Sequence, residues 1–132
     1  MANDLNIQNI VDYWIESSDE DYKTMLDLFQ TRNFGWSLFL GHLVIEKLLK
    51  AHYAKTLDEY PPMIHDLRRI GERAGIEFDE QALVMIETIS QFNIRARYDD
   101  YRREFQRRCT PEYAAEWIEN IKKIRQWIKT ML

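Results

Sequence analysis

Ionisable side chains interrupt an otherwise apolar stretch at residues 39–53, whose sequence is FLGHLVIEKLLKAHY. Those in its middle are His42, Glu46, Lys47 and Lys50. The apolar residues recur at helical spacing, and a helix that is apolar nearly all round is usually buried. A buried charge is costly, so each of these groups must be paired, reach the surface along its stem, or take part in chemistry. We therefore predict that Glu46 has a basic partner, with Arg97, His65 and the lysines as candidates.

A second polar group, His65-Asp66, follows Pro61-Pro62. Two interpretations are open. Asp66 fits the start of a helix, where the helix dipole favours a negative charge. Alternatively, His65 belongs to the cluster around Glu46. The predicted polar cluster comprises Glu46, Lys47, Lys50, His65 and Asp66.

The remaining histidines do not suggest a metal site. His42 and His52 lie ten residues apart in the sequence, almost three helical turns, so they cannot share one metal within a helix. No cysteine or histidine spacing resembles zinc binding, and no glycine-rich phosphate loop or nucleophile elbow is present. We predict no metal and no cofactor, and we interpret His42 as a packed, hydrogen-bonded histidine.

Arginines concentrate at residues 95–108, which hold six arginines and three acidic residues, whereas residues 1–31 hold seven acidic residues and one basic one. Residues 95–108 can therefore attract anions, although the whole chain has a net charge of −4. It is either a solvated loop and helix, or a phosphate, RNA or subunit contact surface. The candidate nucleotide- or RNA-binding residues are Arg95, Arg97, Tyr98, Tyr101 and Arg102.

Length and composition limit the classes of protein to consider. A chain of 132 residues predicts one domain, over residues 1–132, with one core. The net charge argues against wholesale coating of nucleic acid. A single cysteine, Cys109, suits a reducing compartment, and neither a membrane span nor a signal peptide is visible. We expect a cytoplasmic protein that does not engage a membrane.

The pattern of the chain is all-α, because glycine and proline are few and little of the sequence alternates with period two. Helices are predicted over residues 6–31, 34–55, 64–74, 80–92 and from Pro111, after a cap at Thr110, to the C-terminus, with Asp100–Arg107 partly helical. Long helices joined by short turns pack as an up-down bundle, here of about five helices. Leu43, Ile86 and Ile121 lie on apolar stripes and are predicted core residues.

Three motifs together resemble a HEPN domain, a family named for higher eukaryotes and prokaryotes and for nucleotide binding. They are Glu46-Lys47-Leu-Leu-Lys50-Ala51, then His65-Asp66-Leu67, then Ala96-Arg97-Tyr98-Asp99. The resemblance covers nearly the whole chain. It implies an all-α bundle of about five helices, often a homodimer, and often a nucleotidyltransferase partner. Other members are ribonucleases of toxin–antitoxin and defence systems.

The ribonucleases of the family carry an arginine, four to six residues, then a histidine, near the start of the last long helix. The arginine would hold the scissile phosphate while the histidine moves a proton, in a reaction that needs no metal. Here Arg97 is available, but no histidine follows His65 in the sequence. We therefore favour a non-catalytic binding and assembly module for a nucleotidyltransferase, a nucleotide or RNA. The alternative is a divergent ribonuclease in which Tyr98 or Tyr101 replaces the histidine.

Overall fold

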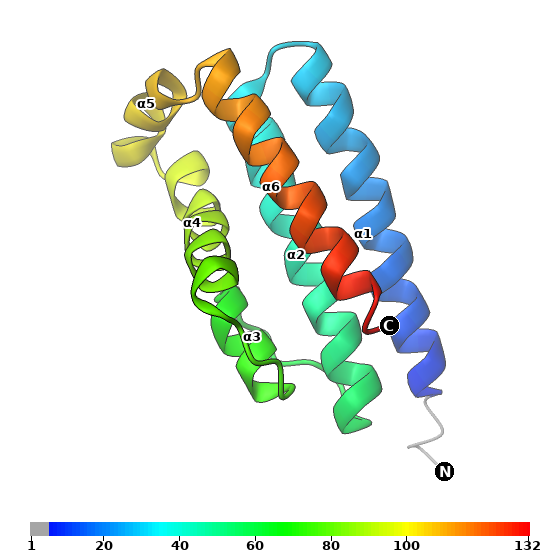
Figure 1. Cartoon of the computed structure of the whole chain (residues 1–132). Helices are drawn as coiled ribbons and strands as arrows, with labels where there is room; N and C mark the ends of the chain where they lie inside the picture. The colour runs from blue at the N-terminus through cyan, green and yellow to red at the C-terminus, as the bar shows by residue number, and fades with distance from the viewer. Residues whose placement is uncertain (1–5) are drawn as a thin grey trace.

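The computed structural model describes residues 6–132 and forms a bundle of helices (Figure 1). The elements are α1 (Ile7–Gln30), α2 (Phe34–Leu57), α3 (Leu67–Arg73), α4 (Glu80–Arg97), α5 (Asp99–Arg108) and α6 (Pro111–Lys129). The described part of the chain contains no strand, so the predicted all-α bundle is confirmed. Within the same residues, no helix has both the length and the apolar character that crossing a bilayer requires.

Helix α2 is the centre of the bundle, and it contacts each of the other five helices. Its sequence explains this position, because apolar residues occur on nearly all of its sides and each side needs a covering neighbour. Helices α1, α4 and α6 supply most of that cover. Ile86 on α4 and Ile121 on α6 are fully buried, as predicted.

Leu43 was predicted to lie in the core, and this prediction is wrong. The residue is only half-buried and lies on the one stripe of α2 that its neighbours leave partly open. The members of that stripe are Trp36, Leu40, Leu43 and Lys47. Helical spacing identifies an apolar stripe, but when a helix has several such stripes it does not show which one the neighbouring helices leave uncovered. Here the neighbours cover the side of α2 that carries Val44, Ile45 and Leu48.

Helices α1 and α2 approach closely because small residues line their contact. Ser18 donates a hydrogen bond to the backbone carbonyl of Val44 at 2.8 Å, and Ser37 donates one to that of Met25, also at 2.8 Å. Both serines are buried, so these bonds satisfy hydroxyls that would otherwise be costly. A Cβ added at Gly41 would collide with the end of the Ile121 side chain, so glycine lets α2 and α6 pack closely here.

Several predicted helix boundaries are confirmed and others shift. Helix α1 is continuous, and Thr110 caps α6 by accepting a hydrogen bond from the Tyr113 amide at 3.1 Å. Helix α3 begins at residue 67 rather than 64, because Asp66 accepts a hydrogen bond from the Arg69 amide and caps it there. Gly75 follows α3 with a φ of 85°, a left-handed conformation that glycine adopts without strain.

The segment before α6 is more helical than its sequence predicted. Helix α4 continues to Arg97 instead of ending at Phe92, since nothing in residues 93–97 breaks a helix. Tyr98 then adopts an extended conformation, and α5 begins at Asp99. The result is six helices in residues 6–132 instead of about five.

A matched pair of leucines on α2 tests this packing. Leu48 is fully buried, and Leu48→Ala should lower the free energy of unfolding by about 2–5 kcal/mol through lost contacts and a cavity. Leu43→Ala should lower it clearly less, because that side chain is only partly buried. Urea denaturation of both variants measures the difference, and equal losses would contradict the placement of α2.

Candidate functional site

Glu46 forms the centre of a buried group of polar side chains. Its carboxylate accepts a hydrogen bond from Nδ1 of His65 at 2.9 Å through Oε1, and one from Nζ of Lys50 at 3.2 Å through Oε2. Lys50 follows Glu46 by four residues, which places both on one face of α2. The backbone of α2 therefore fixes one ion pair, and the loop before α3 adds the second partner. We call Glu46, Lys50, His65 and His42 the Glu46 cluster.

His42 joins the cluster one turn earlier on α2. Its Nε2 donates a hydrogen bond to the backbone carbonyl of His65 at 3.2 Å and lies 3.6 Å from Oε1 of Glu46. Burial lowers the pKa of His42 below its ordinary value, because the charged form loses its hydration, and the carboxylate of Glu46 offsets this only in part. The neutral imidazole thus ties the loop at His65 to α2, as expected for a packed histidine.

Lys50 is buried between a carboxylate and an aromatic ring. Its ammonium group lies 5.3 Å from the centre of the Trp14 ring, in addition to its bond to Glu46. The ring of Tyr60 also packs against Trp14 in an edge-to-face arrangement, with the ring centres 6.5 Å apart. A cation over an indole face is stabilised by the ring quadrupole. The charge of Lys50 is therefore satisfied within the protein, and only His65 of the cluster has an exposed side chain.

Two of the five predicted cluster residues lie elsewhere. The ammonium group of Lys47 binds Asp21 at 2.6 Å and Ser17 at 2.7 Å, and so ties α2 to α1. Asp66 serves as the cap of α3. The structure brings together Glu46, Lys50 and His65, and it adds His42.

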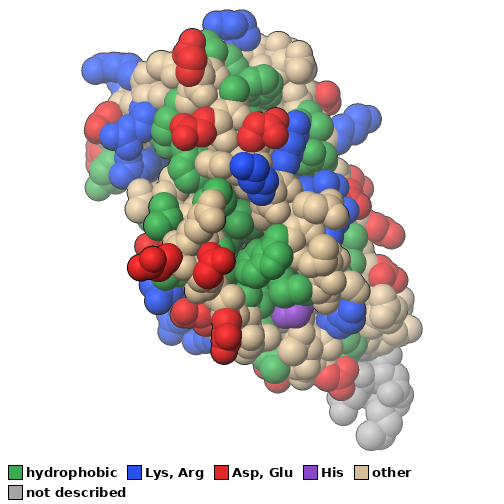
Figure 2. Space-filling model, viewed as in Figure 1, with side chains coloured by type: hydrophobic (Ala, Val, Ile, Leu, Met, Phe, Trp, Pro, Cys, Tyr) green, Lys and Arg blue, Asp and Glu red, His purple; other side chains and the backbone are tan. Residues whose placement is uncertain are grey.

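The second candidate region lies where α4 meets α5. We call Arg95, Arg97, Tyr98, Tyr101 and Arg102 the basic junction. Figure 2 shows basic side chains, interspersed with acidic ones, at this end of the molecule.

Most side chains of the basic junction are exposed to solvent. Arg97 has no carboxylate partner within residues 6–132. Its Nη1 donates a hydrogen bond to Oδ1 of Asn93 at 3.2 Å, and its guanidinium lies 5.9 Å from the centre of the Tyr98 ring. Arg97 is therefore not the partner of Glu46. Arg102 has a weak pair with Asp99 at 3.4 Å.

A cavity of about 310 Å³ opens between the two helices of this junction. Its lining comprises Gln91, Ile94, Arg95, Tyr101 and Glu104. Two of these, Arg95 and Tyr101, were predicted from the sequence. Ile94 was missed because the helix was expected to end at Phe92. Gln91 and Glu104 lay in segments that were predicted to be helical, but the sequence did not show that these two segments meet.

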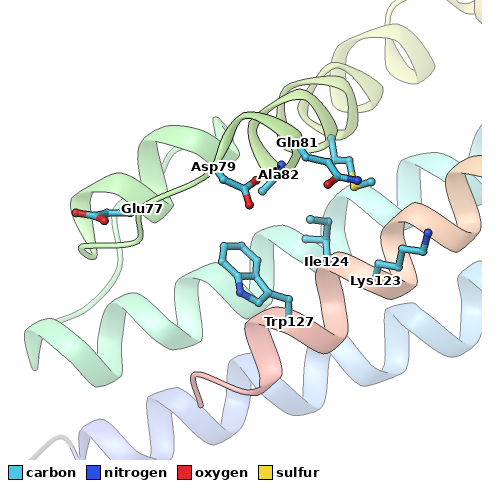
Figure 3. A pocket seen from close by; sticks show the side chains of 8 residues that line it. Glu77, Asp79, Gln81, Ala82, Lys123, Ile124 and Trp127 are labelled. Carbon is cyan, nitrogen blue, oxygen red and sulfur yellow. Dashed lines mark hydrogen bonds between the residues drawn. The ribbon is translucent and has the colours of Figure 1, made fainter.

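Another cavity, of about 280 Å³, lies between α6 and the first turns of α4, and none of the predicted site residues lines it. Figure 3 shows Lys123, Ile124 and Trp127 on its α6 side, facing the start of α4.

The described residues offer little support for metal or thiol chemistry. Residues 6–132 contain no group of three or more metal-ligating side chains placed to hold an ion. Burial raises the pKa of the Cys109 thiol to about 11, so this thiol is protonated at neutral pH and is no nucleophile.

The family model of the HEPN domain matches residues 11–131. The chain belongs to the HEPN domain family. No curated protein and no solved structure matched the chain. In this HEPN domain, the motifs that carried the resemblance occupy two places: the Glu46 cluster and the end of α4 with the start of α5.

His42 makes the stability of the domain depend on pH. Its pKa is lowered in the folded protein, so the unfolded chain binds more protons as the pH falls below about 6.5. The free energy of unfolding should therefore decrease from pH 7 to pH 5. An NMR titration of His42 measures the cause directly, and a pKa at or above 6.5 would contradict the neutral, buried imidazole.

Proposed function

We propose that this HEPN domain is a non-catalytic binding module whose basic junction holds a phosphate group of RNA or of a nucleotide. The observation that carries the proposal is the state of the arginines there. Within residues 6–132, neither Arg95 nor Arg97 is paired with a carboxylate, and Arg95 also lines the cavity between α4 and α5, unlike the equally unpaired Arg69 and Arg73 on α3. A guanidinium that reaches solvent and is not neutralised can bind phosphate through two parallel hydrogen bonds.

The geometry supports binding more than cleavage. His65 is the last histidine in the sequence, and its Nδ1 is already bonded to Glu46. The first residue of α3, Leu67, is bonded through its amide to Ser90, which precedes Arg97 by seven residues on α4. Seven residues correspond to about 10 Å of helix rise. A proton donor must lie within hydrogen-bond reach of the reacting atom, so His65 is badly placed to act with Arg97 on one phosphate.

We infer the partners of this domain from its family. HEPN domains often form homodimers and often work with a nucleotidyltransferase, and we include both in the proposed assembly. The partly open stripe of α2, with Trp36 as its most exposed aromatic residue, supplies apolar surface that a second copy would cover.

The proposal predicts salt-dependent binding of single-stranded RNA. Fluorescence anisotropy at about 50 and 200 mM salt should show affinity that falls as salt rises, because binding releases counterions from the phosphates. Arg95→Ala/Arg97→Ala should weaken binding and flatten the salt dependence. Arg69→Ala/Arg73→Ala is the matched control, since it removes two exposed arginines from α3 and should leave binding nearly unchanged.

Two results would overturn the proposal. Equal loss of affinity in both double variants would mean that binding is nonspecific, and no binding by the parent protein would remove the nucleic-acid function. Cleavage of the RNA by the parent, lost in Arg95→Ala/Arg97→Ala, would show that the domain is a ribonuclease instead.

A further inference from the structure

The cavity between α4 and α5 exposes apolar side chains beside polar groups that could select a ligand. Ile94 is 49% exposed and Tyr101 is 53% exposed, and both line the cavity. The lining residues follow helical spacing, with positions 91, 94 and 95 on one face of α4 and positions 101 and 104 on one face of α5. The cavity is thus a groove between two helix faces, with its apolar part open to solvent.

We propose that this groove binds the base of a guanine nucleotide, whose phosphate lies toward Arg95. This proposal rests on the proposed function, and it names the ligand that the basic junction selects. Tyr101 and Ile94 provide surfaces against which a flat base can stack. Glu104 and Gln91 provide hydrogen-bonding groups for the edge of that base.

Glu104 is the residue that favours guanine over the other bases. Glu104 is exposed and lines the cavity, and within residues 6–132 its carboxylate has no ion pair and no hydrogen bond, so both oxygens are able to accept from a ligand. An ionised carboxylate accepts hydrogen bonds only. Guanine presents two adjacent donors, N1–H and the 2-amino group, which match the two oxygens of a carboxylate.

The other three bases lack this match. Adenine and cytosine each place a lone pair beside their amino group, which a carboxylate would repel, and uracil has one donor between two acceptors. Rejection of an imperfect partner by an unpaired polar group is an effective source of specificity. Gln91 offers an amide that donates to the O6 acceptor of guanine, which adds to the same preference.

Charge and size are consistent with a nucleotide in the groove. A carboxylate alone would repel a phosphate, and Arg95 lines the same cavity and supplies the opposite charge. The volume of about 310 Å³ lies at the lower end of the range for small-molecule sites. A single nucleotide, free or within a single-stranded RNA, fits this description.

Isothermal titration of the full chain at low salt tests the inference with GMP, IMP and AMP. IMP lacks the 2-amino group of guanine but keeps N1–H. The parent should bind GMP more tightly than AMP by about tenfold or more, with IMP between them. A second arm uses a single-stranded RNA with one guanine and the same RNA with adenine there, which distinguishes a free nucleotide from RNA as the source.

Glu104→Gln separates recognition of the base from simple charge. The variant removes a negative charge beside the phosphate, so a purely electrostatic role predicts tighter binding of all three nucleotides. Our proposal predicts weaker binding of GMP together with unchanged or tighter binding of AMP. Glu20→Gln, an exposed glutamate on α1, is the matched control and should change neither.

The outcomes distinguish this inference from the proposed function. Binding that is equal for guanine and adenine in both arms, but is lost in Arg95→Ala/Arg97→Ala, would overturn the guanine groove and leave the phosphate site in place. No binding of any nucleotide or RNA would overturn both. A tighter GMP complex in Glu104→Gln would also overturn the groove.

Discussion

The pairing of a buried carboxylate, Glu46, is the constraint on which the rest of this bundle depends. Helix α2 is surrounded by its neighbours, so a charge in its middle has little contact with water. Removing a carboxylate from water costs several kcal/mol unless charged and hydrogen-bonded partners replace the hydration. Lys50 and His65 are these partners. Because His65 belongs to the loop before α3, satisfying the charge also fixes where that loop and the start of α3 lie.

The same arrangement positions the basic junction. Helix α3 is tied to α4 through the Leu67 amide and Ser90, and α4 continues without a break to Arg97. Helix α5 has a strongly polar sequence and only one buried residue, Phe105, whose ring lies 5.5 Å from that of Phe92 on α4. Phe105 is thus the one buried anchor of a helix whose remaining side chains are exposed to solvent. A short, polar helix with a single anchor is suited to binding rather than to supporting the core.

Much of the fold could be predicted because its signals are local. Thr110 and Asp79 form side-chain caps that a sequence reveals, and the apolar periodicity of α1 and α6 is strong. The end of α4 could not be predicted, because residues 93–97 neither favour nor break a helix decisively. The misplacement of Leu43 has another cause, since a helix that is apolar all round does not show which side its neighbours leave open.

The kinds of residues in the candidate site could be predicted from the sequence, but their arrangement in space could not. A charge in an apolar helix indicates that a partner exists, but only the tertiary arrangement selects His65 over Arg97. Likewise, the arginine content of residues 95–108 indicates an anion site, whereas the contribution of Gln91 and Glu104 depends on how α5 folds against α4. Residues that meet across a helix junction are invisible to an analysis of either helix alone.

A double-mutant cycle of Glu46→Gln and Lys50→Met tests the central claim most directly. Each single substitution leaves a buried polar group without its partner, which should lower the free energy of unfolding by about 3–5 kcal/mol. The double variant leaves no such charge, so its loss should be smaller than the sum of the two single losses by about 1–3 kcal/mol. Losses that add to within about 0.5 kcal/mol would contradict the account, because they would show that the two groups act independently.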